Sequence, residues 1–172
     1  RTSYFHHSLG GYHGAKLGKY QELIDNHLIK NNMKVINMMN AKYIIALDQK
    51  TRQPIIQLNQ SALGNAWFVK NIEWVNNPDE ELNSLNKIDP GLTASINKKY
   101  RKDIGSFNYT EDSFIRLSAY TPNKLIYNTK LEADGFAVFS EIFYPEGWQA
   151  YINNIPVEHF SVNYVLCAKN SI

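Results

Sequence analysis

Cysteine is almost absent from this sequence of 172 residues, and so are long runs of apolar residues. The single cysteine, Cys167, excludes an internal disulfide framework and a zinc site built from several thiolates. A membrane-spanning helix needs roughly 18 consecutive apolar residues, and no window of the sequence reaches that length. We therefore expect the chain as given to fold around an ordinary hydrophobic core, with Cys167 as a buried, unreactive thiol in a strand.

An excess of charge of one sign is also missing. Eighteen Lys and Arg residues against 16 Asp and Glu residues leave a formal net charge of +2, which is too small to indicate a nucleic-acid partner. Hydrophobic residues make up 44% of the chain, enough for one sizeable core. We predict a single domain, or a fragment of one, over residues 1–172, mainly helical over 1–42, mixed over 43–112 and β-rich over 113–172.

Helical patterns are few and lie in the first half of the chain. Apolar residues recur at steps of three and four between Gly14 and about Asn32, which predicts an amphipathic helix. A second short helix is predicted over Met33–Asn40, with its methionines filling the core. A third is predicted from Asn77, as the N-cap, to about Asn86, because a proline and three acids follow the cap.

Strand-like texture dominates after about residue 43. Tyr43–Leu47 and Ile55–Leu58 predict a hairpin, and residues 66–75 predict one continuous strand. The last third predicts five further strands at Phe114–Tyr120, Lys124–Leu131, Gly135–Phe143, Trp148–Ile152 and Tyr164–Ala168. The predicted fold is α+β, with the N-terminal helices packed on a largely antiparallel β-sheet and a C-terminal part that is β-sandwich-like.

Asparagine is unusually common. Twenty asparagines outnumber the 18 Lys and Arg residues together. We interpret the excess mainly as a compositional bias, although the adjacent Asn153 and Asn154 predict a tight turn between strands.

Signatures of catalysis and of cofactor binding are absent from the sequence. It contains no GxSxG, HExxH, Walker or dinucleotide-binding motif. Histidines are the commonest metal ligands, and His6, His7 and His13 lie close together, but the glycines around them indicate a turn rather than a rigid site. We therefore predict no metal and no cofactor. His13 and Tyr12 are expected to pack or cap at the start of the first helix.

One segment could carry chemistry on carbohydrate. Ser140 and Glu141 lie on a predicted strand, and Tyr144, Glu146 and Trp148 follow closely. Paired carboxylates catalyse glycoside hydrolysis, at separations that a sequence does not fix. The interpretation that we favour is that Glu141 has a structural role and that Trp148 belongs to the core.

Several segments of the chain together resemble a known family. They are RTSYFHHSLGGYHGAKLGKYQELIDNHL with INMMNAKYII near the start, ALGNAWFV and PDEEL in the middle, and VFSEIFYPEGWQAYINN with HFSVNYVL near the end. In this order they resemble the YfhO-like family of bacterial membrane proteins, particularly its Bacteroidetes branch. Two positions depart from the family pattern: Asn153-Asn154 replaces the usual Asp-Gly, and Cys167 replaces a basic residue.

The resemblance implies a role at the cell envelope. Members of the family are large polytopic membrane proteins, similar to glycosyltransferases that take sugars from polyprenyl-phosphate carriers. Their catalytic acid is expected in an external loop near the N-terminal membrane helices, a segment that this sequence does not include. The chain begins at Arg1 without an initiator methionine or a signal segment, and we expect it to be a C-terminal extracytoplasmic (periplasmic) piece of a longer parent.

Three functions follow as hypotheses. In the first, the chain is a non-catalytic domain that works with the transmembrane part of the same polypeptide and supports or orients a cell-envelope glycan. The candidate contacts are Tyr12, His13, Tyr144 and Trp148, because aromatic faces with nearby polar groups suit sugars. The second hypothesis is a free-standing carbohydrate-active hydrolase that uses Glu141 and Glu146, and the third is a structural scaffold without a ligand.

Overall fold

The structure is a computed structural model that describes residues 8–10, 17–108, 110 and 112–170. It divides into two compact units, Arg1–Leu63 and Gly64–Ile172. The described residues form an α+β fold in which strands predominate and most strand pairs are antiparallel. The predicted fold class is therefore confirmed.

The helices of the first unit are short and pack against one another. Helix α2 (Gly18–Leu23) continues directly into a π-helical turn, η1 (Ile24–Leu28), and α3 (Met33–Met38) follows. Asn32 caps α3 by accepting a hydrogen bond from the Lys34 backbone N–H at 3.1 Å. The side chains of this unit that are fully enclosed include Leu23, His27, Val35 and Met38.

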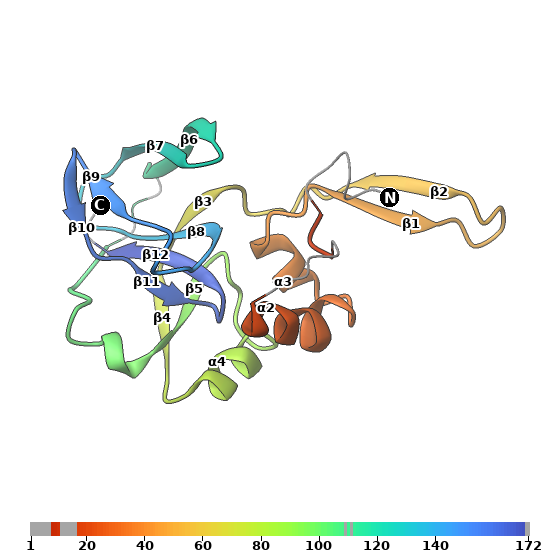
Figure 1. Cartoon of the computed structure of the whole chain (residues 1–172), viewed down its shortest axis with the longest axis horizontal. Coiled ribbons are helices and arrows are strands. Elements are labelled where there is room, and N and C mark those ends of the chain that lie inside the picture. The colour runs from red at the N-terminus through yellow and green to blue at the C-terminus, as the bar shows by residue number, and fades with distance from the viewer. Residues whose placement is uncertain (1–7, 11–16, 109, 111, 171–172) are drawn as a thin grey trace. The chain divides into compact units, whose positions relative to one another are not determined.

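A β-hairpin completes the first unit. Strand β1 (Tyr43–Leu47) pairs antiparallel with β2 (Pro54–Leu58), as the sequence predicts. The base of the hairpin is fixed to α3 through Asn59, whose side-chain amide donates to Asn37 Oδ1 and to the Ala41 carbonyl, both at 2.9 Å. The rest of the hairpin runs on beyond this anchor (Figure 1).

The second unit is built on a four-stranded antiparallel sheet. Its strand order is β11 (Phe160–Val162), β12 (Leu166–Asn170), β8 (Phe136–Ile142) and β3 (Ala66–Val69) (Figure 1). A second hairpin, β6 (Phe114–Thr121) with β7 (Lys124–Lys130), packs against this sheet. The contact is apolar and joins Phe68 and Ala137 of the sheet to Ile115 of the hairpin.

The segment between these elements forms a parallel strand pair that the sequence did not predict. Strand β4 (Asn71–Val75) leads into helix α4 (Pro78–Ser84), and β5 (Thr93–Asn97) returns parallel to β4. Asn77 is the N-cap of α4 as predicted, and its side chain accepts from the Glu80 backbone N–H at 2.9 Å. The predicted single strand over residues 66–75 is wrong, because the chain leaves one sheet at Lys70 and enters another.

Two short hairpin turns close the second unit, and both use residues with positive φ. Asn153 and Asn154, at φ 51° and 67°, connect β9 (Ala150–Ile152) to β10 (Ile155–Val157), which confirms the predicted tight turn. Asn163 and Tyr164, at φ 49° and 74°, connect β11 to β12. Tyr164 therefore lies in a turn, and the prediction that it begins a strand is wrong.

The turn at Asn163 and Tyr164 is buried and is held by a network of polar groups. The Tyr164 backbone N–H donates to Glu81 Oε1 of α4 at 3.1 Å. The Asn163 side chain accepts from the Ser95 backbone N–H at 2.8 Å, and the Asn163 backbone N–H donates to the Ser95 carbonyl at 2.9 Å. The Ser84 hydroxyl joins α4 to Ser95 Oγ at 2.7 Å. These bonds satisfy buried groups and fix α4, β5 and the β11–β12 turn to one another.

We predict that Glu81→Ala lowers the free energy of unfolding by about 1–3 kcal/mol, because it leaves the buried Tyr164 N–H without this acceptor. Urea denaturation measures the effect. Glu73→Ala is the matched control, since Glu73 is an exposed carboxylate on β4, and it should change stability by less than about 0.5 kcal/mol. Equal stability of the two variants would contradict the assigned role of Glu81.

Candidate functional site

Two of the predicted contact residues, Tyr144 and Trp148, meet at one turn. The turn follows β8 and is fastened to the start of β12 by a hydrogen bond from the Phe143 backbone N–H to the Val165 carbonyl, at 2.7 Å. Within it, the backbone N–H groups of Gly147 and Trp148 both donate to the Tyr144 carbonyl at 3.0 Å. The backbone therefore holds the two aromatic residues at fixed positions relative to each other.

Gly147 allows the Tyr144 ring to lie against the turn. A Cβ atom at position 147 would lie 2.5 Å from Cδ1 of Tyr144, closer than such atoms can approach. The φ of Gly147 is not in the left-handed region, so the requirement for glycine here comes from the ring and not from the backbone. The Tyr144 side chain is 48% exposed and presents part of its surface to solvent.

The remaining predictions for the contact residues concern the burial of Trp148 and the positions of Tyr12 and His13. Trp148 is half-buried and is not one of the fully enclosed core residues, so the expectation that it belongs to the core is not met. Tyr12 and His13 lie outside the described residues.

The two carboxylates of the hydrolase hypothesis occupy different environments. Glu141 is half-buried on β8, whereas Glu146 is exposed in the turn. Burial raises the pKa of the Glu141 carboxyl above its ordinary value of 4.5. Neutral Glu141 is therefore favoured over the carboxylate to a greater extent than in an exposed glutamate.

Glu141 belongs to a largely buried group of titratable side chains that sequence reasoning did not bring together. Tyr127 of β7 lies near it and packs edge to face on Phe139, with ring centroids 5.0 Å apart. The Tyr127 hydroxyl is enclosed and has no hydrogen-bond partner among the residues that the structure describes. Burial, with a smaller contribution from Glu141, raises the pKa of the Tyr127 phenol. The only sequence signal for this group is strand alternation, which puts Phe139 and Glu141 on one face of β8.

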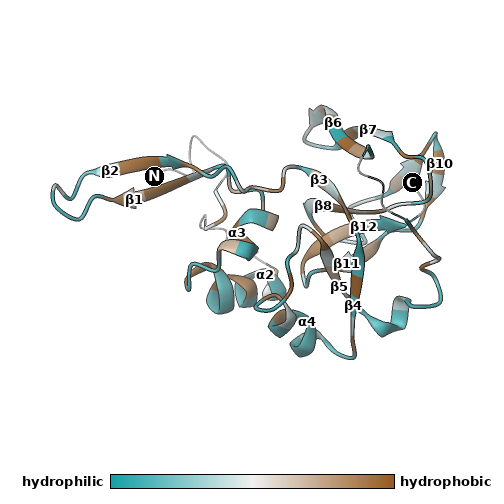
Figure 2. Ribbon diagram, turned by 180° about the vertical axis from the view of Figure 1, so that it is seen from behind, coloured by the Kyte–Doolittle hydropathy of each residue, from teal (hydrophilic) through white to brown (hydrophobic). Residues whose placement is uncertain are grey.

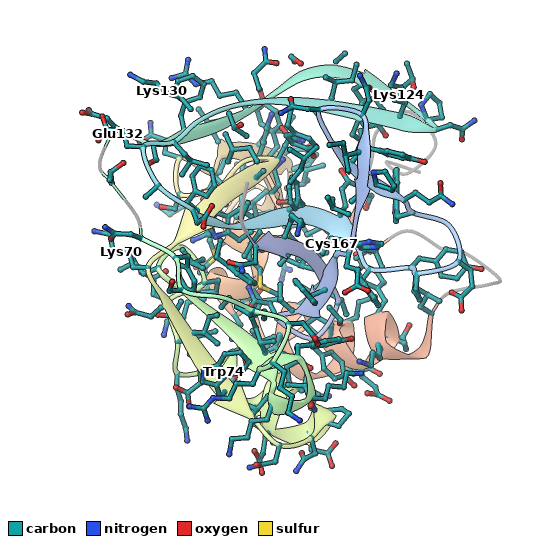
Figure 3. All side chains as sticks on the ribbon, turned by 90° about the vertical axis from the view of Figure 1, so that its left-hand side faces the viewer. Lys70, Trp74, Lys124, Lys130, Glu132 and Cys167 are labelled. Atoms are coloured by element: carbon teal, nitrogen blue, oxygen red, sulfur yellow. The ribbon has the colours of Figure 1, made fainter. Side chains whose placement is uncertain are left out.

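Cys167 is the third member of this group and lies in the interior of the second unit (Figure 3). Burial raises the pKa of its thiol from 9.0 to about 12, and Glu141 adds to the shift, while a backbone hydrogen bond from Tyr144 opposes it. The thiol is therefore protonated at neutral pH and is a poor nucleophile. The prediction of a buried cysteine in a strand is confirmed.

Among the described residues, no group of three or more His, Cys, Asp or Glu side chains is arranged to hold a metal ion. His6, His7 and His13 lie outside those residues. His159 is half-buried against Phe143, with ring centroids 5.3 Å apart, and burial lowers the pKa of its imidazole.

Comparisons with known proteins identify no relative. No protein-family model, no curated protein and no solved structure matches this chain. In the part of the chain that the structure describes, no helix is both long and apolar enough to cross a bilayer.

We predict that Cys167 contributes an alkaline dependence to stability. The unfolded thiol loses its proton near its ordinary pKa of 9.0, whereas the folded thiol keeps it up to about pH 12. This contribution is therefore complete below pH 9 and is lost as the pH rises from 9 towards 12. Urea denaturation of the wild type and of Cys167→Ala should give a constant stability difference from pH 6 to 8 and a changing one above pH 9. Parallel pH profiles throughout would refute the assignment.

Proposed function

We propose that this chain is a non-catalytic extracytoplasmic domain of a polytopic membrane protein resembling polyprenyl-phosphate-sugar-dependent glycosyltransferases of the YfhO-like family. In this proposal it works beside the transmembrane part of the same polypeptide and supports or orients a cell-envelope glycan. The observation that carries the glycan role is the turn from Tyr144 to Trp148, where backbone hydrogen bonds hold the exposed Tyr144 close to the half-buried Trp148.

The segments that carry the family resemblance have a shared structural role, which supports treating them together. ALGNAWFV contacts VFSEIF through Ser140, whose hydroxyl donates to the Gly64 carbonyl at 2.6 Å and whose backbone N–H donates to the Asn65 carbonyl at 2.9 Å. PDEEL contacts HFSVNYVL through Glu81 and the Tyr164 backbone N–H. Four motifs that are distant in sequence thus pair within the second unit, and their joint occurrence is what a common fold would require.

The state of the titratable groups supports a non-catalytic role. A nucleophile needs an adjacent base or a lowered pKa. The pKa values of the Cys167 thiol and the Tyr127 phenol are instead raised by burial, which keeps both groups protonated and enclosed by the core.

The turn has the chemistry that sugar recognition uses. Sugars present apolar C–H faces that stack on aromatic rings and hydroxyl groups that need hydrogen-bond partners. Tyr144 supplies a partly exposed ring, and Glu146 and Gln149 are exposed polar residues next to it in sequence. A contact through one partly exposed ring and a few polar side chains is suited to weak binding of a polymer.

We predict that Tyr144→Ala weakens binding of cell-envelope polysaccharide by the 172-residue chain at least about fivefold, since it removes the exposed stacking ring. A glycan array followed by titration calorimetry measures this. The control is Tyr120→Ala, because Tyr120 is a comparably exposed tyrosine at 57% on β6, and it should leave binding unchanged.

Gly147→Ala tests in the same assay whether glycan binding depends on the position of the Tyr144 ring rather than on the stability of the fold. The added methyl group displaces the Tyr144 ring, while the backbone accepts alanine, so binding should weaken with a nearly unchanged melting temperature. If no envelope glycan binds the wild type, the scaffold hypothesis replaces this proposal. The membrane part is tested separately by the full-length gene, which should encode about ten or more apolar spans upstream.

The hydrolase that uses Glu141 and Glu146 is a second candidate, favoured by one observation. A carboxyl whose pKa is raised by burial is what a general acid requires, and Glu141 has that property. Hydrolysis of a cell-wall glycan by the purified chain, lost in Glu141→Gln, would establish this function and overturn the non-catalytic proposal.

A further inference from the structure

The hairpin of β1 and β2 presents an apolar face to solvent. Tyr43 lies opposite Leu58, Ile45 opposite Ile56, and Leu47 opposite Pro54. Residues directly opposite each other, and alternate residues along a strand, lie on the same face of a hairpin. These six residues therefore form one continuous surface, which we call the hairpin face. Both strands are coloured as hydrophobic over much of their length (Figure 2).

The exposure of the hairpin face is unusual for apolar side chains. Its Tyr, Ile and Leu side chains are between 53% and 70% exposed. Soluble proteins scatter exposed apolar residues singly, whereas a contiguous group marks an interaction surface. An isolated two-stranded hairpin is also marginally stable in water, so a covering surface would stabilise this one.

The β6–β7 hairpin of the same chain shows the ordinary arrangement. Ile115 is buried on its inner face, while Arg116 and Asn128, which lie opposite each other, are exposed and polar. This part of the hairpin thus has its apolar residues inside and its polar residues outside, whereas Tyr120 and Ile126, nearer the turn, are exposed. Single exposed apolar residues occur on other described hairpins too, at Tyr120 and Ile126 of β6–β7 and at Tyr151 and Ile155 of β9–β10. The hairpin face differs from them because it consists of three successive opposed pairs of apolar residues.

The charges around the hairpin face favour an anionic partner. Lys42 lies at its base, and Lys50 and Arg52 lie in the loop at its far end; all three are exposed. The one carboxylate of this region, Asp48, accepts hydrogen bonds from the backbone N–H groups of Lys50 and Thr51 at 2.9 and 2.7 Å. A second copy of the hairpin would bring basic residues against basic residues in either orientation, because both ends are basic.

We propose that the hairpin face docks on the surface of an anionic phospholipid bilayer. The apolar side chains would enter the boundary between headgroups and acyl chains, and Lys42, Lys50 and Arg52 would face lipid phosphates. The contact is shallow, because no strand among the described residues pairs with the outer edge of β1 or of β2. Hydrocarbon cannot satisfy the backbone N–H and C=O groups of such edges. This inference goes beyond the proposed function and does not depend on glycan binding.

Vesicle co-sedimentation tests the proposal with the 172-residue chain. The chain should bind vesicles of phosphatidylcholine with phosphatidylglycerol, bind those of phosphatidylcholine alone more weakly, and dissociate as salt is added. Ile45→Ser with Ile56→Ser should weaken binding at least about tenfold. Lys50→Gln with Arg52→Gln should weaken it by about fivefold for each charge removed. The matched control is Tyr120→Ser with Ile126→Ser on the β6–β7 hairpin, two exposed apolar residues whose replacement should change nothing.

A labelled variant tests the same contact independently, in case the serine variants do not fold. Ile56→Cys carrying an environment-sensitive fluorophore should brighten and shift to the blue on anionic vesicles, and the buried Cys167 should not compete for the label. Absence of vesicle binding, or binding that Ile45→Ser with Ile56→Ser leaves intact, overturns the proposal. A dimer seen by analytical ultracentrifugation that requires Ile45 and Ile56 would assign the face to a second copy instead. None of these outcomes bears on the glycan assays, so the two proposals fail independently.

Discussion

The hydrogen bond from the Tyr164 backbone N–H to the Glu81 carboxylate is the contact on which the second unit most depends. Tyr164 has a left-handed backbone, which costs a residue with a side chain on the order of 1–2 kcal/mol. The turn that it forms with Asn163 is nevertheless buried, where a backbone N–H or C=O group without a partner is costly. Glu81 supplies one acceptor and Ser95 supplies two further bonds to Asn163. The position of β12, and with it the Val165 carbonyl that holds the Tyr144 turn, follows from this arrangement.

The sequence correctly predicted those elements that are determined by a few neighbouring residues. The Asn77 cap, the hairpin of β1 and β2 and the turn at Asn153 and Asn154 each rest on a few adjacent residues, and the structure has all three. β5 was missed because Ile96 is the only large apolar side chain of its five residues, TASIN. The burial of this strand comes from its contacts with β4, α4 and β11, which the residues of the strand themselves do not reveal. The break at Lys70 was missed for a similar reason. The backbone N–H groups of Lys70 and Asn71 both donate to the Leu92 carbonyl, which redirects the chain.

Many of the asparagines have a structural role, although we interpreted their number mainly as a compositional bias. Of the seven residues other than glycine with positive φ among those described, five are asparagine, and they end helices or form hairpin turns. Asparagine accepts the left-handed conformation more readily than other residues with a side chain. With only nine glycines in the chain, asparagine does at Asn31, Asn40 and Asn153 what glycine commonly does elsewhere.

Only part of the candidate site was predictable from the sequence. The predictable part depends on local spacing, and the rest depends on tertiary packing. The sequence placed Tyr144 and Trp148 near each other because they are four residues apart, but the half-burial of Trp148 depends on packing that no local pattern encodes. The grouping of Tyr127, Glu141 and Cys167 depends on where three strands, β7, β8 and β12, lie in the folded unit and on their register. Burial favours the protonated forms of all three, so the core holds the reactive groups in their less reactive states.

What the chain leaves accessible is a partly exposed aromatic ring on a rigid turn and an apolar hairpin face with basic ends, and both are surfaces suited to binding rather than to bond breaking.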